Sequence, residues 1–127
     1  MTAQGHPRAI FERAIERRNL LVAEATLRAE IPRPTLLDLL ELVALYAEKD
    51  PRRHSRAAVR WLERWLDQVG DATLDDVELA SSALRALGGR HNAAAFSTLR
   101  DLAERATSVG AARRRGRGVS GRAASSG

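Results

Sequence analysis

The residue types that could carry catalysis or bind a metal are few in this chain and form no familiar site. Its three histidines are far apart in the sequence, at His6, His54 and His91, and no H-x-x-x-H pair occurs. Asp75, Asp76 and Glu78 fall where a helix is expected to begin, and carboxylates in a first helical turn stabilise the helix itself. We therefore expect no metal site, and carboxylates with a structural role.

Serine and cysteine chemistry is equally poorly supported. Ser81 and Ser82 lie in no Gly-x-Ser-x-Gly elbow, and the sequence has no Gly-rich phosphate loop of the usual spacing. Cysteine is absent, which excludes disulfides and thiolate metal ligands and fits a reducing compartment. The sequence therefore predicts a cytoplasmic protein that is not an enzyme and has no cofactor.

The strongest candidate for binding is a row of arginines on one side of a helix expected over residues 51–69. Its members are Arg52, Arg53, Arg56, Arg60 and Arg64. Such a row could contact the phosphates of a nucleic acid or an acidic partner. Glu63 and Asp67 fall in the same arc, at a spacing that allows ion pairs with the row. A solvated face, paired in part, is therefore the competing interpretation.

The segment over 110–127 holds the whole positive excess of the chain. Residues 1–109 carry sixteen basic and sixteen acidic side chains, so five further arginines account for the net charge of +5. They are Arg113, Arg114, Arg115, Arg117 and Arg122. Because Gly, Ser, Ala and Arg cannot build a core, this composition predicts a disordered tail. The tail could bind nucleic acid, or it could be a solubilising end shaped by the codon bias of a GC-rich genome.

Trp61 and Trp65 lie one helical turn apart in the same expected helix. An exposed tryptophan can anchor a peptide or stack on a base, which makes Trp61 a candidate aromatic anchor. Both rings fall within the apolar arc of the helix, and this position favours burial in the core over exposure.

The elements that must position these residues are helices. Apolar residues recur at helical spacing along nearly the whole chain, strand-like alternation is absent, and Gly and Pro cluster at a few breaks. The pattern predicts six helices, over about 7–18, 20–30, 36–49, 51–69, 74–87 and 92–109. An unbroken helix through Asn19 is the alternative for the first two, but it would place Arg18 within the apolar stripe.

Capping residues indicate where several of these helices begin and end. Two Thr and Asp pairs have the spacing of a capping box, Thr35 with Asp38 and Thr73 with Asp76. Asp50 before Pro51 combines an N-cap with a proline at the first helical position. Gly88 and Gly89 favour a left-handed C-terminal cap. Residues 36–49 are apolar nearly all round, which predicts the most buried helix.

The second half of the chain weakly repeats the part before it. An offset of 38 aligns Thr35 with Thr73, and an offset of 37 aligns Trp65 with Leu102. Paired helices repeating at about this period form solenoids. We predict an all-α fold of three stacked antiparallel hairpins, a short α-solenoid or right-handed helical array, with an ordinary six-helix bundle as the alternative. The predicted single domain covers 7–109, after a flexible N-terminus at 1–6, and no apolar stretch is long enough to span a membrane.

Residues 14–66 include the segments AIERRNLLVAEATLRAE, PRPTLLDLLELVALYAEKDPRRH and RAAVRWLERWL. In these segments the chain resembles small all-helical proteins of high-GC actinobacteria, and the resemblance implies a helical fold without a particular activity. Arg18-Asn19 also resembles the turn between paired helices of tetratricopeptide repeats, although the Pro and Gly-aromatic landmarks of that family are mostly missing.

Taken together, these features favour a binding role over catalysis. Stacked hairpins, a neutral body and the lack of active-site chemistry predict a noncatalytic protein-interaction or scaffold module with a protein partner. The alternative is a nucleic-acid-binding protein that uses the Arg-rich tail together with the basic face of residues 51–69. No residue pattern specifies the partner or an oligomeric state.

Overall fold

The computed structural model describes the backbone of residues 6–126 and the side chains of residues 6–116. Within this part the chain is all-helical and contains no strand, as predicted. The helices are α1 (Pro7–Glu16), α2 (Leu20–Glu30), α3 (Leu36–Lys49), α4 (Pro51–Val69), α5 (Leu74–Ala86) and α6 (Asn92–Ser126). The predicted flexible N-terminus lies outside the described residues except for His6, which is the N-cap of α1.

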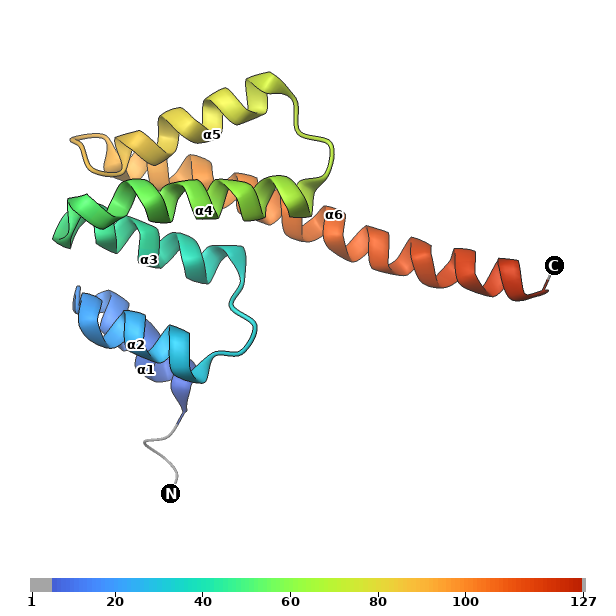
Figure 1. Cartoon of the computed structure of the whole chain (residues 1–127), viewed down its shortest axis with the longest axis horizontal. Coiled ribbons are helices and arrows are strands. Elements are labelled where there is room, and N and C mark those ends of the chain that lie inside the picture. Colours follow the sequence, from blue (N-terminus) through green and yellow to red (C-terminus); the bar gives the residue numbers. More distant parts are fainter. Residues whose placement is uncertain (1–5, 127) are drawn as a thin grey trace.

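Successive helices pair into three hairpins, α1 with α2, α3 with α4, and α5 with α6. The hairpins stack on one another, and α3 contacts both α1 and α2 on one side and α4 and α6 on the other (Figure 1). The stacked antiparallel arrangement agrees with the predicted fold class. Because α3 lies between two layers, its nearly uniform apolar character is explained.

The turn between α1 and α2 confirms the predicted hairpin over an unbroken helix. Arg18 takes a positive φ of 58° and reverses the chain, an unusual conformation for a residue with a Cβ. Asn19 then caps α2, since its side-chain oxygen accepts a hydrogen bond of 3.2 Å from the Val22 N–H. The reversal brings Arg18 to the surface, where its guanidinium lies 3.4 Å from the Glu48 carboxylate.

Both predicted capping boxes are present. In each box a threonine hydroxyl accepts from the N–H of the aspartate and the carboxylate accepts from the N–H of the threonine, in the pairs Thr35 with Asp38 and Thr73 with Asp76. Each box satisfies two backbone donors that have no partner inside the helix. The starts of α3 and α5 are therefore fixed by local chemistry.

Of the two other predicted caps, one is confirmed in position and one is corrected. Asp50 and Pro51 occupy the N-cap and first helical positions of α4 as predicted, although the Asp50 carboxylate makes no cap hydrogen bond and lies 3.6 Å from the Arg53 guanidinium. Gly88 and Gly89 are not left-handed; in the described chain the glycine with positive φ is Gly70, at 78°, which ends α4. After α5 the chain continues in right-handed turns, with the Gly89 N–H bonded to the Ala86 carbonyl.

The core has two apolar clusters, one on each side of α3. The larger cluster joins α3, α4, α5 and α6 around Trp61 and Trp65. The smaller cluster joins α1, α2 and α3 around Phe11 and Leu45. Burying a large apolar side chain contributes about 1.5–3 kcal/mol to stability. The stack of hairpins is therefore held together mainly by the apolar side chains that the neighbouring helices bury against α3.

The last helix is longer than predicted. We expected it to end near Gly110, but α6 continues to Ser126 and extends beyond the end of the α3–α4 hairpin (Figure 1). Residues 110–116 are helical and have described side chains. Ala111, Ala112 and the three arginines that follow are strong helix formers, which explains the continuation. The side chains after residue 116 lie outside the described part.

Candidate functional site, an arginine-lined groove

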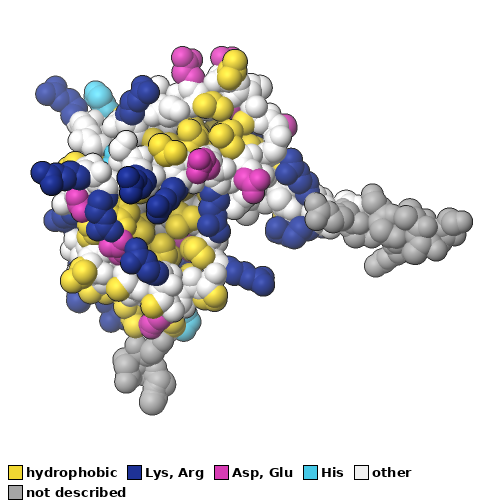
Figure 2. Space-filling model, in the orientation of Figure 1, with side chains coloured by type: hydrophobic (Ala, Val, Ile, Leu, Met, Phe, Trp, Pro, Cys, Tyr) yellow, Lys and Arg dark blue, Asp and Glu magenta, His cyan; other side chains and the backbone are white. Residues whose placement is uncertain are grey.

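A groove with a volume of about 800 Å³ lies between α2 and α4. The two helices pack on α3 and stand apart from each other, so α3 supplies much of the floor. The apolar lining consists of Leu27, Ile31, Leu39, Leu42, Val43, Ala57 and Trp61. In Figure 2 dark-blue side chains gather around a yellow apolar patch on this face.

The two walls of the groove differ in charge. All five arginines of the predicted row line it from α4, namely Arg52, Arg53, Arg56, Arg60 and Arg64. The α2 side contributes one arginine, Arg28, and one carboxylate, Glu24, followed by apolar residues and Pro32 and Pro34. The groove is therefore basic along α4 and mostly apolar along α2.

The rotation of α4 that turns the row into the groove is fixed by two tryptophans. Four of the arginines recur every fourth residue, which places them on one face of the helix. On the inner face the Trp61 indole N–H donates to the Leu36 carbonyl at 2.9 Å, and the Trp65 N–H donates to the Leu102 carbonyl at 2.8 Å. These bonds tie α4 to α3 and to α6.

Trp61 is therefore a core residue, as the apolar arc favoured. Its side chain is 1% exposed and forms part of the groove lining. The alternative of an exposed aromatic anchor at Trp61 does not fit this burial.

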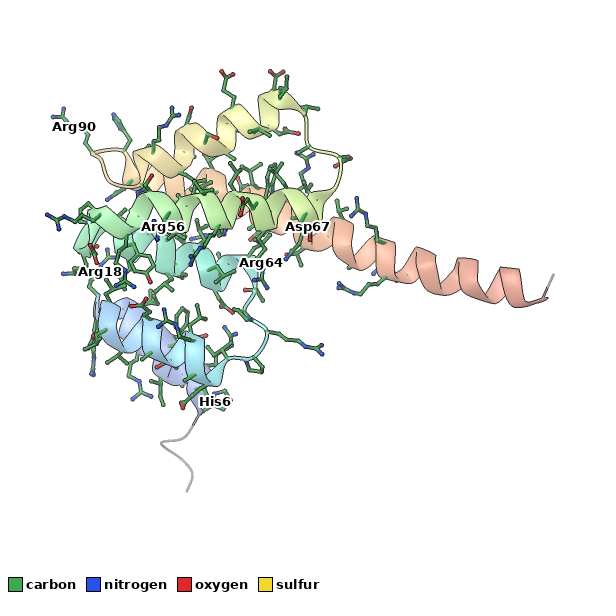
Figure 3. All side chains as sticks on the ribbon, viewed as in Figure 1. His6, Arg18, Arg56, Arg64, Asp67 and Arg90 are labelled. Atoms are coloured by element: carbon green, nitrogen blue, oxygen red, sulfur yellow. The ribbon has the colours of Figure 1, made fainter. Side chains whose placement is uncertain are left out.

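The expected local pairing of the row is largely missing. Within the described residues, no carboxylate lies within ion-pair distance of Arg52, Arg56, Arg60 or Arg64, so Glu63 and Asp67 do not neutralise them. Arg64 instead reaches the Pro34 carbonyl at 3.5 Å, at the end of the groove where α3 begins. Arg56 and Arg64 can be followed along α4 in Figure 3. Most of the positive charge of the row is therefore not paired with a carboxylate of the described residues.

A polar cluster of Glu24, Tyr46 and Arg53 lines one end of the groove. The Glu24 carboxylate accepts hydrogen bonds from the Tyr46 hydroxyl and from Arg53, and Arg28 pairs with it at 3.0 Å. The Arg53 guanidinium also donates to the Tyr46 oxygen at 3.0 Å and lies 4.7 Å from the centre of the Tyr46 ring. We call this cluster the clasp, because it joins α4 to α2 across the groove.

Burial and the hydrogen bonds within the clasp shift the pKa values of Glu24 and Tyr46. Burial alone would raise the pKa of Glu24, but hydrogen bonds from Tyr46 and Arg53 outweigh burial and hold that pKa below its ordinary value. Burial and the hydrogen bond to Glu24 raise the pKa of Tyr46 to about 12. Glu24 is therefore an anion and Tyr46 a donor at neutral pH, and the clasp leaves Arg53 as the one member of the row that is paired inside the described fold.

The other candidate residues lie away from the groove. His54 and Ser81 border a separate pocket of about 390 Å³ between α4 and α5, while His6 and His91 are exposed elsewhere. Asp75 and Asp76 stand in the first turn of α5, as expected. In the described residues no group of three or more His, Cys, Asp or Glu side chains could hold a metal ion.

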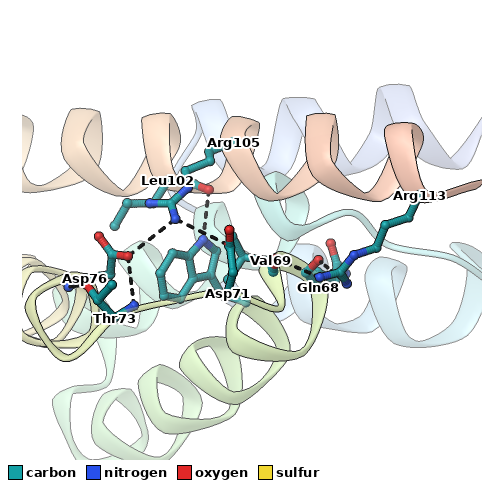
Figure 4. A network of polar contacts seen from close by, with 9 residues as sticks. Gln68, Val69, Asp71, Thr73, Asp76, Leu102, Arg105 and Arg113 are labelled. Carbon is teal, nitrogen blue, oxygen red and sulfur yellow. Dashed lines mark hydrogen bonds and ion pairs between the residues drawn. The ribbon is translucent and has the colours of Figure 1, made fainter. Parts of the chain in front are cut away.

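The arginines of the C-terminal segment lie in different environments in the structure. Arg113 donates to the Val69 carbonyl at 3.2 Å and to the Gln68 carbonyl at 3.4 Å, so it covers the end of α4 (Figure 4). Arg114 and Arg115 are exposed on α6, and the side chain of Arg117 lies outside the described part. Arg113 thus extends the α4 row by one cation, whereas its neighbours stand on the projecting helix.

Comparison with protein-family models, curated proteins and solved structures finds no significant match to this chain. None of the helices in the described range combines the length and the apolar character that crossing a membrane requires. The site must therefore be interpreted from its own geometry.

Proposed function

We propose that this protein is a noncatalytic protein-interaction module that uses the groove between α2 and α4 to hold an acidic partner. The observation that carries the proposal is the combination of an apolar floor with a row of arginines, of which Arg53 alone is paired with a carboxylate within the described fold. Apolar burial supplies affinity, and a row of like charge steers an oppositely charged partner and rejects others.

The residue types fit a protein partner. Arginine is enriched at protein interfaces, because its long apolar stem packs while its guanidinium pairs with carboxylates. An aliphatic floor of this kind is typical of grooves that receive apolar side chains.

A nucleic acid is the second candidate, and Arg113 is the observation that favours it. This residue extends the α4 row, and Arg114 and Arg115 continue along α6. Against this candidate, the groove floor is apolar and its aromatic residues Tyr46 and Trp61 are buried, so no exposed ring stands ready to stack on a base. The protein partner therefore remains the better supported function.

The test compares three forms of the full chain in affinity purification from the native host. The groove variant is Arg56→Glu/Arg60→Glu, and the matched control is Arg13→Glu/Arg90→Glu, which makes the same charge change away from the groove. We expect protein partners to be recovered with the wild type and the control and to be lost with the groove variant. Equal recovery with all three forms contradicts the proposal.

A second measurement separates the two candidates. Labelled RNA and DNA are titrated with the wild type and with Arg113→Gln/Arg114→Gln/Arg115→Gln at several salt concentrations. If nucleic acid is the natural ligand, affinity falls steeply with salt and falls again in the triple variant. We expect only weak binding that is abolished at physiological salt.

A further inference from the structure

We infer that the occupant of the groove is one amphipathic α-helix of about three turns, contributed by a partner protein and acidic along a single edge. The inference rests on the proposed function and specifies the shape and charge of what binds. Three properties of the groove carry it: the nature of its walls, its length and the placement of its charge.

The walls favour a helix over an extended peptide. Apart from Ile31, Pro32 and Pro34 in the connection between α2 and α3, the groove is lined by helices, whose backbone N–H and C=O groups bond within the helix. An extended segment laid between them would find no sheet edge to pair with, and its own backbone groups would be left unpaired against an apolar floor. A helix satisfies its own backbone and presents only side chains.

The length of the arginine row sets the length of the occupant. Arg52 and Arg64 are twelve positions apart, which is about 18 Å along a helix that rises about 1.5 Å per residue. A helix lying alongside therefore contacts the whole row with about twelve residues. Apolar side chains at i, i+4, i+7 and i+8 would then face Leu39, Val43 and Ala57 on the floor.

The charge sits on one wall, which orients the occupant about its own axis. Five of the six groove arginines come from α4, whereas Leu27, Ile31 and Pro32 dominate the α2 side. A helix with carboxylates along one edge pairs with α4 and keeps its apolar stripe on the floor. A helix with carboxylates on both edges would place one set against the α2 side, where Leu27, Ile31 and Pro32 offer no partner and Arg28 is already paired with Glu24.

The experiment uses a synthetic 14-residue helix, held by a lactam bridge on its outer side. Leucines form its stripe, glutamates its edge, and Ala and Gln the remainder. A second peptide replaces each glutamate by lysine, and a third has the composition of the first in scrambled order. Binding to the full chain is followed by Trp fluorescence, because Trp61 borders the groove, and by amide chemical shifts over 24–34 and 52–64.

We expect saturable binding of the acidic peptide and none of the lysine or scrambled peptide. Arg56→Glu/Arg60→Glu should weaken binding by about ten-fold or more, and Arg13→Glu/Arg90→Glu should leave it unchanged. Ala57→Leu, which fills the floor without altering charge, should weaken binding as well, whereas Ala57→Ser should not. Equal affinity for the acidic and lysine peptides, or absence of saturable binding, overturns the inference.

The outcomes separate the inference from the function on which it rests. If the helix peptides do not bind but the native partner is still lost with the groove variant, the occupant is not a helix and the interaction module stands. If the groove variant changes neither peptide binding nor recovery of the native partner, the inference and the proposed function both fail. Sedimentation that shows a dimer abolished by Arg56→Glu/Arg60→Glu assigns the groove to a second copy of the chain, and this result also overturns the inference.

Discussion

The guanidinium of Arg8 and the carboxylate of Asp38 face each other through two hydrogen bonds of 2.8 Å each. This paired contact joins α1 to the start of α3, between residues thirty positions apart. Asp38 also accepts from the Thr35 N–H at 3.0 Å, so a single carboxylate serves the capping box and the ion pair. Its side chain is 9% exposed, whereas that of Arg8 is 41% exposed.

Replacement of Arg8 by alanine should destabilise the fold by about 1–2 kcal/mol, because it leaves the Asp38 carboxylate buried without its cation. The figure lies below that for a fully buried pair, since Arg8 is exposed in part. Urea unfolding followed by circular dichroism measures it. Arg17→Ala, at an exposed arginine near the end of α1, is the control and should change stability by less than about 0.5 kcal/mol.

The same pair predicts a dependence on acid. Burial alone would raise the pKa of Asp38, but hydrogen bonds from Arg8 and from the Thr35 backbone outweigh it and hold the pKa below its ordinary value of 3.8. The stabilisation is therefore present above pH 4 or so and is lost as pH falls through the lower pKa of the folded state. In Arg8→Ala this loss should be smaller, and an unchanged acid slope would show that the pair is not responsible.

Trp61→Phe should lower the free energy of unfolding by about 1–3 kcal/mol, because the Leu36 carbonyl loses a donor and the core loses volume. Val59→Ala, on the exposed side of the same helix, should cost far less. Denaturant titration with far-UV circular dichroism compares the two. Equal effects would contradict the assignment of Trp61 to the core.

His54 should make the fold less stable in mild acid. Burial lowers its pKa below 6.5, with partial opposition from a hydrogen bond to the Leu84 backbone, and its buried Nε2 atom has no hydrogen-bond partner among the described residues. The folded state thus prefers neutral His54, so stability is complete above about pH 6.5 and declines as pH falls toward the lower folded-state pKa. Ser81 and Arg85 of α5 face this pocket and offer no carboxylate to offset the proton.

The measurement is thermal unfolding between pH 7.5 and 5 for the wild type and His54→Gln. A single proton changes stability by at most about 1.4 kcal/mol per pH unit, so the difference between the two profiles should remain within that slope. His91→Gln, at an exposed histidine, should keep the wild-type profile. If His91→Gln flattens the profile and His54→Gln does not, the sensitivity is wrongly assigned.

Gly70→Ala should destabilise the end of α4 for two reasons. The φ of 78° costs an L-residue about 1–2 kcal/mol, and an added Cβ would overlap the Arg113 guanidinium. Arg113 would therefore have to leave its place over the α4 carbonyls. Because both changes disrupt the same contact, Gly70→Ala/Arg113→Ala should cost less than the sum of the single variants. Strict additivity in urea unfolding would show that α6 does not hold Arg113 at this site.

The features that the sequence predicted well depend on neighbours within one turn. The capping boxes at Thr35 and Thr73, the reversal at Arg18 and the burial face of α4 are all decided by local spacing. The arginine row was also found in this way, because four-residue spacing alone places its members on one face.

The groove itself was not predicted, because it depends on distances between helices. Nothing in the local pattern of α2 shows that Leu27 and Ile31 would line a space opposite Arg56, or that Glu24 would pair with Arg53. The clasp and the Arg8–Asp38 pair both join residues about thirty positions apart. The only available indication of the groove was that α2 has more apolar positions than burial of one face requires.

The end of α6 was missed for a similar reason. Composition alone favoured disorder after Gly110, but Arg113 obtains two carbonyl partners at the end of α4 that only the packed hairpins bring within reach. Ala111 and Ala112 then cost little to hold in a helix. The helix propensity of these residues and the tertiary contact of Arg113 therefore act together in this segment.

The row on α4 also has a cost for the protein that carries it. Like charges four residues apart repel along a helix, so Arg52, Arg56, Arg60 and Arg64 weaken the free fold in the place where they would serve recognition. Proteins commonly give up some stability at sites kept for function. Any anion that settles among these arginines relieves the repulsion, so occupancy of the groove and resistance to unfolding should rise and fall together.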